Sequence, residues 1–333
     1  MISIRHSAAA GAIALAVLNG CTQPIGTEES DQPGEQASAV TVQTWLWSDW
    51  SNTVHVKLYA CAASPASPVA HPSASCQIEP DYVLIGGGAS VVGNPGTGLL
   101  TASYPSDFEH GIWTGSSKDH IVSGWHQLKV SAIGLKLDGL SAAQLRAQMQ
   151  LVPAVNSMAT AHPDSMATVT GDTLLVGGGA RTEYATGQLL TVSAPYTLGT
   201  TSWYAASKDH GISDPGKVWS YAIGVPRCPS GYAGGCLESR LTFSAESTDH
   251  TGYGVELQAP SPWNDDEDYT RDGVTTSCGS ETTYSSQGRL LLTATLSPPP
   301  SSSVRRCRTE ASDHVWPDSG RAYAYSLELR KRP

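Results

Sequence analysis

The chain has 333 residues, and its composition excludes several classes of protein before any motif is considered. Its formal net charge is −10, so nucleic acids and anionic lipid surfaces are poor partners for the body of the protein. Only 15% of the residues are charged, and nine tryptophans and 13 tyrosines stand beside two phenylalanines, as is common in exported all-β proteins.

The first 20 residues have the pattern of a secretory signal peptide. Arg5 precedes an apolar run over residues 8–18 that is too short to span a bilayer. The sequence Leu-Asn-Gly-Cys, ending at Cys21, resembles the lipobox of bacterial lipoproteins. This resemblance implies that Cys21 is the lipidated first residue of the mature chain. An ordinary secretory peptide with a nearby cysteine is the alternative.

Residues 21–39 are polar and lack an apolar period, which predicts a flexible tether. In lipoproteins of two-membrane bacteria, a residue such as Thr22 after the cysteine implies sorting to the outer membrane. We therefore expect a protein of the bacterial cell envelope, at the outer membrane or cell surface, that contacts the membrane only through its lipid.

The rest of the chain contains three copies of one pattern, in residues 40–139, 140–227 and 228–333. Each copy has a strand-like run leading into a small-residue segment, then a Leu-Leu run, an Asp-His pair and a closing strand. An internal repeat of this length predicts one recurring structural unit per copy. The interval from the histidine to the following Ile or Leu is 13 residues in each copy: His120 to Ile133, His210 to Ile223 and His314 to Leu327.

Strand patterns dominate each copy. In chain order, β-prone runs occur at 53–60, 82–85, 99–103, 128–137 and 146–152, with counterparts of the central runs in the second copy. One short helix or turn is predicted over 141–146, where Ser141 and Gln144 have the spacing of a capping box. In the third copy, Tyr323, Tyr325, Leu327 and Leu329 alternate with smaller or polar residues, which predicts a half-buried strand.

These patterns predict an all-β fold of three tandem antiparallel β-sandwich-like repeats, after a signal peptide and a flexible tether. The rival architecture is a single pseudo-symmetric body in which the copies share strands. The two differ in one observable, because separate repeats would each have a contiguous core of their own.

Six cysteines remain once Cys21 is set aside, and an exported chain favours disulfides over zinc. In the third copy, Cys278 replaces the middle glycine of the Gly-Gly-Gly motif, and Cys307 stands seven residues before His314, where the other copies have tryptophan. The repeat should bring these two positions together. The expected pairs are Cys61 with Cys76, Cys228 with Cys236, and Cys278 with Cys307.

The Gly-Gly-Gly-Ala segments beginning at Gly86 and Gly177 match neither of two enzymatic motifs. A dinucleotide-binding loop would open a helix, and a hydrolase oxyanion loop would require a Gly-x-Ser-x-Gly elbow, which does not occur in the chain. We interpret them as strand ends where backbone must either approach backbone closely or turn with a positive φ.

The Ser-Lys-Asp-His segments with the preceding tryptophans are the candidate ligand-binding sites. Tryptophan suits stacking on a sugar ring, and an aspartate beside a histidine could ligate a metal or form an acid–base pair. The structural alternative is a turn in which Asp caps backbone amides. The candidate residues are Trp113, Lys118, Asp119, His120, Trp203, Lys208, Asp209 and His210.

Two further motifs contain residues that can bind metal ions, but their spacing supports a metal site only weakly. His71-Pro72 and His162-Pro163 are interpreted as rigid loop entries, because no acidic residue keeps a fixed spacing near them. Asp266, Asp268 and Asp272 resemble part of a calcium loop, but the twelfth residue is Gly279 where a bidentate Glu is needed. No other cofactor is expected.

The Gly-rich segment, the tryptophan and the closing Tyr-Ala-Ile are similar to repeats in uncharacterised exported bacterial proteins. In those repeats a cysteine in the Gly region is often matched by one near the tryptophan, as for Cys278 and Cys307. The resemblance spans residues 70–330 and implies an exported fold without a defined activity.

The function predicted first is a non-enzymatic binding module for carbohydrate or a cell-envelope polymer, which requires an exposed tryptophan beside each Asp-His pair. The alternative is a structural or adhesive envelope protein that contacts another surface protein, which predicts buried tryptophans and a large exposed face. A secreted hydrolase comes third, because three copies of an active site on one chain would be unusual.

Overall fold

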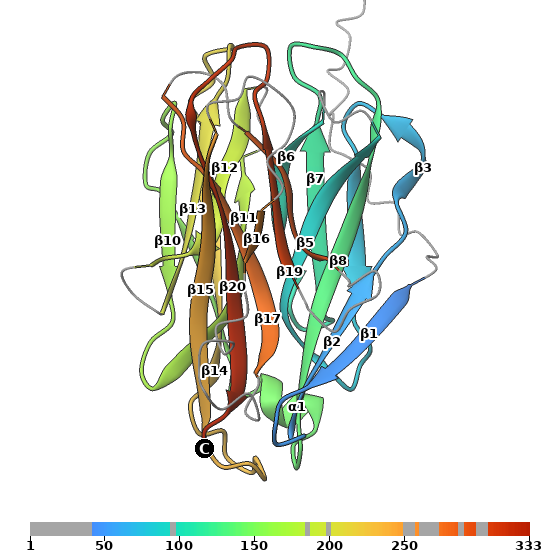
Figure 1. Ribbon diagram of the computed structural model, residues 1–333, viewed down its shortest axis with the longest axis vertical. Helices are drawn as coiled ribbons and strands as arrows, with labels where there is room; N and C mark the ends of the chain where they lie inside the picture. Colours follow the sequence, from blue (N-terminus) through green and yellow to red (C-terminus); the bar gives the residue numbers. More distant parts are fainter. Residues whose placement is uncertain are drawn as a thin grey trace, which may run out of the picture. The chain divides into compact units, whose positions relative to one another are not determined.

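The computed structural model describes residues 42–93, 98–183, 187–197, 201–248, 257–259, 273–285, 290–297 and 306–333. Within these residues the chain forms antiparallel strands and one short helix, in three sheets (Figure 1). The all-β fold predicted from the sequence is therefore confirmed. The signal peptide, Cys21 and the tether lie outside the described residues.

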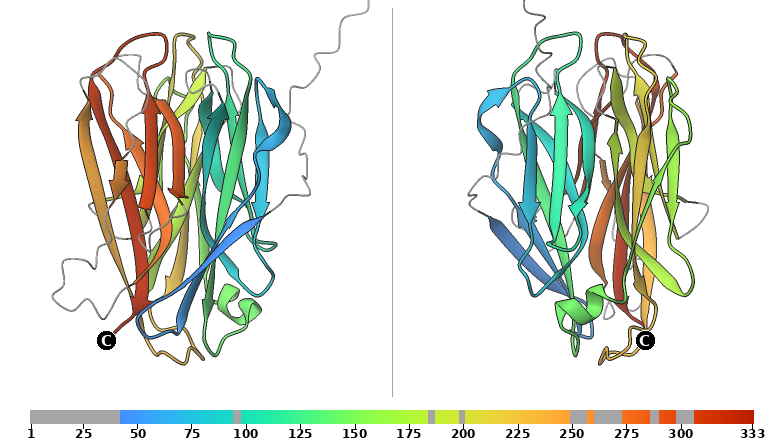
Figure 2. Two further views of the ribbon diagram at one scale, coloured as in Figure 1. Left: turned by 45° about the vertical axis from the view of Figure 1, so that its right-hand side comes forward. Right: turned by 180° about the vertical axis from the view of Figure 1, so that it is seen from behind.

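The first sheet contains strands from the beginning and the end of the chain. Its strand order is β1 (Gln43–Ser48), β2 (Val54–Ala60), β8 (His126–Leu137), β5 (Val83–Gly93), β18 (Leu290–Ser297), β19 (Arg306–Ser312) and β16 (Leu257–Ala259), and β3 (Ser64–Val69) also pairs with β8. Figure 2 shows the blue and green strands of this sheet beside its red strands.

The other two sheets have six strands each. The second has the order β4 (Ser73–Gln77), β7 (Ile112–Lys118), β6 (Leu99–Asp107), β11 (Thr173–Thr182), β14 (Val218–Pro226) and β9 (Gln150–Val155). The third has the order β10 (Asp164–Thr168), β13 (Ser202–Asp209), β12 (Gln188–Pro195), β17 (Val274–Thr282), β20 (Gly320–Lys331) and β15 (Leu237–Thr248).

Each copy contributes strands to two of the three sheets, and the same arrangement is found for all three copies. Its Gly-motif strand and closing strand lie in one sheet, and the two strands between them lie in another sheet, beside the Gly-motif strand of a different copy. The joining pairs are β5 with β18, β6 with β11, and β12 with β17. The expectation of three separate sandwiches is thus wrong, and the rival architecture with shared strands describes this chain. The intervals 40–139, 140–227 and 228–333 mark repeats of sequence and do not delimit separate sheets.

The hydrophobic core is also shared between the copies. Val83, Leu174 and Val274 stand at equivalent positions of the three copies and belong to one continuous cluster of buried side chains. Leu99, Leu189 and Leu290, again one from each copy, form a smaller cluster of their own. A single copy therefore has no complete core, because its apolar residues pack against those of the other two.

The glycine segments lie where strands of different copies approach one another. A Cβ atom on Gly177 would lie 1.9 Å from the carbonyl oxygen of Ile85, and one on Gly86 would lie 2.7 Å from that of Thr276. Neither distance is sterically possible without a shift of the backbone. The interpretation of these segments as close-approach sites is confirmed.

The predicted helix and disulfides are present. In α1 (Ala142–Arg146), the Ser141 hydroxyl accepts a hydrogen bond from the Gln144 amide at 3.3 Å, and the Gln144 side chain accepts one from the Ser141 amide at 2.9 Å. The strand expected over 146–152 begins only at Gln150, after this helix. The three bonds join Cys61 to Cys76, Cys228 to Cys236, and Cys278 to Cys307.

The closing strand of the third copy is more deeply buried than its alternating pattern predicts. Ala322 and Ala324 belong to the shared core, whereas Tyr325 packs with Val192 and Ala194 in a separate cluster. Even Glu328 is only 3% exposed. Every residue from Ala324 to Arg330 is buried, so both faces of this part of the strand are covered and the half-buried prediction is wrong.

Candidate functional site at the histidine end

The Asp-His segments of the three copies meet at one end of the protein. His120, His210 and His314 follow β7, β13 and β19, the second middle strand of each copy. Their ring centres lie 5.3 Å apart for His120 and His210, 5.2 Å for His210 and His314, and 6.2 Å for His120 and His314. This end lies opposite the C-terminus (Figure 1).

The three histidines form a closed ring of hydrogen bonds. The Nε2 atom of His120 donates to the carbonyl oxygen of His210, Nε2 of His210 donates to that of His314 at 2.9 Å, and Nε2 of His314 donates to that of His120. All three residues are buried. We call this arrangement the histidine ring. It joins three segments that lie far apart in the sequence.

The histidine ring is a structural element and does not have the geometry of a metal site. Each Nε2 faces a carbonyl oxygen of a neighbouring histidine, and no group of three or more His, Cys, Asp or Glu in the described part of the chain is placed to hold a metal ion. Burial, together with the neighbouring His314 and His120, lowers the pKa of His210 to about 3. His210 is therefore neutral at physiological pH.

The aspartates before the histidines cap the loops that follow. Oδ2 of Asp119 accepts a hydrogen bond from the Gly124 amide at 3.0 Å, and Asp209 accepts one from the Asp214 amide at 3.3 Å. Asp313 in the third copy accepts one in the same way from Asp318, at 3.0 Å. The structural interpretation of this motif, an aspartate that caps a turn, agrees with the arrangement in all three copies.

The other oxygen of the aspartate faces a histidine of the His-Pro dipeptides. Nε2 of His71 lies 2.9 Å from Oδ1 of Asp119, and Nε2 of His162 lies 3.6 Å from Oδ1 of Asp209. In the sequence no acidic residue stands at a fixed spacing near these dipeptides, and the structure places an aspartate beside each histidine. The partner of His71 is 48 residues away in the sequence, so a search for local spacing does not find it.

The two lysines are buried and face carboxylates of the next copy. Burial lowers the pKa of Lys118 to about 8, against the opposing effect of Asp214. Burial also lowers the pKa of Lys208 to about 8, opposed first by Asp318, and its Nζ lies 3.7 Å from the centre of the Tyr284 ring. These two lysines are almost completely buried, so their charges lie inside the protein.

The repeat explains why the third copy lacks this lysine. In the third copy the residue at the lysine position is Ser312. Asp214 and Asp318 supply the facing carboxylates in the second and third copies, and the equivalent residue of the first copy is Gly124. The lysine and its partner are thus missing together.

The tryptophans of the motif lie inside the protein. Trp113 is 1% and Trp203 is 0% exposed, and their indole nitrogens donate to the hydroxyls of Ser103 and Ser193 at 3.0 and 3.2 Å. A Cβ atom on Gly178 would lie 2.4 Å from the Trp203 ring, so the glycine makes room for the indole. The expectation of exposed tryptophans that stack on a ligand is wrong.

The third copy fills the same space with a disulfide. Cys278 and Cys307 stand at the positions of the glycine and the tryptophan, with their Cα atoms 5.2 Å apart.

Among the predicted ligand-binding residues of the first two copies, the tryptophan, lysine and histidine are buried, and the aspartate caps a turn.

The loops immediately beyond the histidine ring carry exposed apolar side chains, which the sequence analysis did not single out. We call this surface the apolar loop end, and its exposed fractions lie between 40% and 72%. Its members are Ile121, Val122, Trp125, Ile212, Val315 and Trp316. The repeat alignment contained the signal, because apolar residues follow the histidine closely in every copy.

The backbone of these loops is held in an unusual conformation. Ile121 has φ 62° and Val315 has φ 65°, while the equivalent residue of the second copy is Gly211 with φ 67°. A positive φ is unfavourable for β-branched residues, and such strain concentrates at functional sites. A Cβ atom on Gly211 would lie 2.4 Å from Ile121 and 2.7 Å from Trp316, so the three loops touch one another.

A mixed polar and apolar groove of about 700 Å³ lies on the first sheet. Trp45 forms part of its wall, and Lys129, Glu310, Ser131 and Thr295 also line it. The hydroxyls of Ser131 and Thr295 lie 3.0 Å apart.

The remaining predictions cannot be placed in the structure. Asp266, Asp268 and Asp272, the calcium candidates, lie outside the described residues, as does Cys21. In the part of the chain that the structure describes, no helix is long and apolar enough to cross a membrane. No protein-family model and no curated protein matches the sequence. A function can therefore be argued only from the surfaces of this chain.

Proposed function

We propose that this chain is a lipid-anchored protein of the bacterial cell envelope whose folded body is a non-enzymatic interaction module. The observation that carries the proposal is the apolar loop end, six exposed apolar side chains on three adjoining loops. Exposed apolar patches of this kind mark surfaces that bind other macromolecules. The polar signature residues of the repeat support a non-enzymatic role, because their contacts lie within the protein.

The size of the loop end favours a protein partner bound with moderate affinity. Full burial of one such side chain contributes roughly 1.5–3 kcal/mol, so burial of the exposed half of six gives on the order of 5–9 kcal/mol. Association costs about 4–15 kcal/mol because the partners lose translational and rotational freedom. The net binding free energy is therefore small unless other contacts contribute. The module is therefore suited to a reversible contact with another envelope protein.

Site-specific photo-cross-linking tests this proposal. A photoreactive amino acid in place of Ile212, in the full chain expressed in its bacterial host, should give an adduct with one protein of defined mass. Leu46 is 58% exposed, similar in character and remote from the loops, so it is the matched control position. The adduct should weaken several-fold when Trp125→Ser, a change at a 72% exposed residue, is added. Equal adduct yields at Ile212 and Leu46 would contradict the proposal.

Carbohydrate binding is the second candidate, and the groove on the first sheet favours it. Trp45 offers an aromatic ring, while Ser131, Thr295 and Lys129 offer hydroxyl and ammonium groups of the kind that bind sugars. In this candidate the sugar would contact Trp45 in the groove, because Trp113 and Trp203 are buried. The cross-linking result separates the two candidates, because a glycan held in the groove produces no protein adduct that depends on Ile212.

A further inference from the structure

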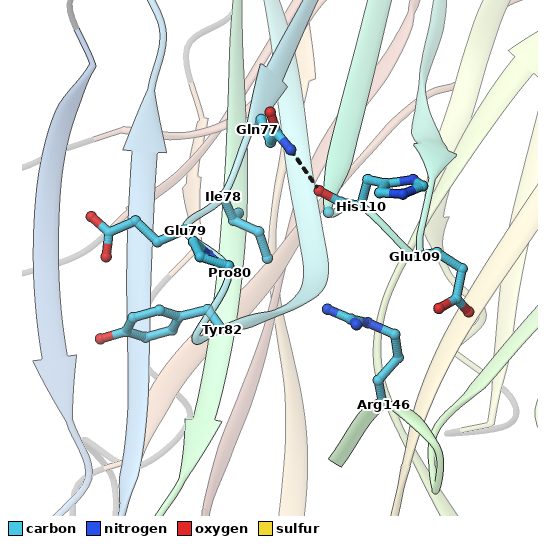
Figure 3. A pocket seen from close by; sticks show the side chains of 9 residues that line it. Gln77, Ile78, Glu79, Pro80, Tyr82, Glu109, His110 and Arg146 are labelled. Atoms are coloured by element: carbon cyan, nitrogen blue, oxygen red, sulfur yellow. Dashed lines mark hydrogen bonds between the residues drawn. The ribbon is translucent and has the colours of Figure 1, made fainter. Parts of the chain in front are cut away.

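A second cavity, of about 400 Å³, lies far from the histidine ring and has a different chemical character (Figure 3). It is formed by the connection between β4 and β5, by the turn between β6 and β7, and by the last residue of α1. Its main lining residues are Gln77, Ile78, Pro80, Tyr82, His110 and Arg146.

Arg146 is directed into this cavity, and among the described residues its buried Nε atom has no hydrogen-bond partner. In Figure 3 its guanidinium group points into the space between Tyr82 and Glu109. Its Nε atom is buried and has no hydrogen-bond partner, and no ion pair to Arg146 occurs among the described residues. A buried donor without a partner normally costs about 1–3 kcal/mol, so its persistence calls for an explanation.

The surrounding carboxylates do not satisfy this arginine. Glu79 forms an ion pair with Lys57 at 2.6 Å, and Figure 3 shows its carboxylate directed away from Arg146. Asp107 accepts hydrogen bonds from the amide and the ring of His110, at 3.0 and 2.7 Å. These contacts hold Glu79 and Asp107 away from Arg146 and fix the orientation of the His110 ring. Glu109 also lines the cavity, and no ion pair between Glu109 and Arg146 occurs among the described residues.

The rest of the cavity is rigid and partly apolar. Leu145 is buried in the core, and the capping box of Ser141 and Gln144 fixes α1, so the backbone of Arg146 is held in place. Gln77 donates to the carbonyl oxygen of His110 at 3.0 Å, next to the disulfide of Cys76. Ile78, Pro80 and Tyr82 supply an apolar wall.

We propose that this cavity is a binding site for a small anionic molecule whose carboxylate or phosphate group pairs with the guanidinium of Arg146. Arginine presents its N–H donors in a planar fork that matches the oxygens of such groups. The apolar wall would contact the body of the molecule, and the volume suits a ligand of the size of a monosaccharide or an aromatic acid. This site is independent of the apolar loop end and does not rest on the proposed function.

Nuclear magnetic resonance of the arginine side chains tests the site in the full folded chain. Benzoate and inorganic phosphate are the two probes, since they share the anionic group but only benzoate has an apolar body. The Arg146 Nε–Hε signal should shift in a saturable way with benzoate, and Arg146→Gln should weaken the affinity about 10-fold or more. Saturation by benzoate alone identifies an organic carboxylate site, and saturation by both identifies a general oxyanion site.

Two further variants separate an effect on benzoate binding from an effect on folding. Arg146→Lys retains the charge but not the fork, and should bind more weakly than wild type. Arg227, an exposed arginine paired with Asp172 at 2.7 Å, is the control, and Arg227→Gln should leave benzoate affinity unchanged. The proposal is overturned if neither probe gives a saturable Arg146 shift, or if Arg146→Gln binds benzoate as tightly as wild type.

Discussion

Replacement of Trp203 by alanine is expected to lower the free energy of unfolding by about 3–5 kcal/mol. The side chain is fully buried, its Nε1 donates to Ser193, and its ring covers Gly178. Removal would leave a cavity beside a glycine that has no side chain to fill it. Because domains are stable by only about 5–15 kcal/mol, this loss is a large fraction of the total.

Urea unfolding followed by far-ultraviolet circular dichroism measures this loss. Trp125→Ala is the matched control, because Trp125 is 72% exposed and its truncation should change the free energy of unfolding by only about 0.5 kcal/mol. If the two variants lose similar stability, Trp203 does not have the structural role assigned to it.

Acidification is expected to destabilise the protein through the histidine ring. His210 has a pKa of about 3 in the folded protein, against an ordinary value of 6.5, because burial and the neighbouring His314 and His120 disfavour its protonation. Below pH 6.5 the unfolded chain binds this proton more readily than the folded one. The stabilisation is therefore complete above pH 6.5 and declines as the pH falls towards 3, by a total on the order of 3–5 kcal/mol.

The free energy of unfolding measured between pH 6.5 and 4 tests this expectation. His210→Gln removes the titrating group, so the slope should decrease by up to about 1.4 kcal/mol per pH unit. Burial also lowers the pKa of His126, so some slope should remain. An unchanged slope in His210→Gln would show that the ring does not resist protonation.

Sequence patterns were sufficient for the features that depend on local spacing or on comparison of the three copies. The capping box of Ser141 and Gln144 is a contact over three residues, and the pairing of Cys278 with Cys307 followed from comparison of the copies. The glycine segments were interpreted as close-approach sites because no motif chemistry surrounded them, and Gly177 against Ile85 confirms this.

The exchange of strands between copies was beyond the reach of the sequence. A strand such as β6 has the same pattern of residues whether it pairs with β5 or with β11, so periodicity cannot identify its neighbour. The burial of Trp113 depends on that choice, because tryptophan is equally compatible with a core and a binding surface. The His71 contact with Asp119 is a similar long-range consequence.

The union of the three loops into one apolar surface, and the cavity of Arg146, emerge only from the three-dimensional arrangement. Ile121, Ile212 and Trp316 are separate apolar residues in the sequence, and the histidine ring brings their loops together. The absence of a partner for Arg146 can be recognised only when its surroundings in the described part of the chain are known. Both surfaces lie outside the residues that are most similar between the copies.

Interdependence of the three copies is the central claim, and the amide spectrum of the isolated first copy tests it most directly. Residues 40–139 contain β5 and β6, whose partners β18 and β11 belong to the other copies. We predict that this fragment gives the narrow amide dispersion of an unfolded chain, whereas residues 40–333 give the wide dispersion of a β-sheet protein. A well-dispersed spectrum and cooperative unfolding of the fragment 40–139 alone would contradict the shared architecture.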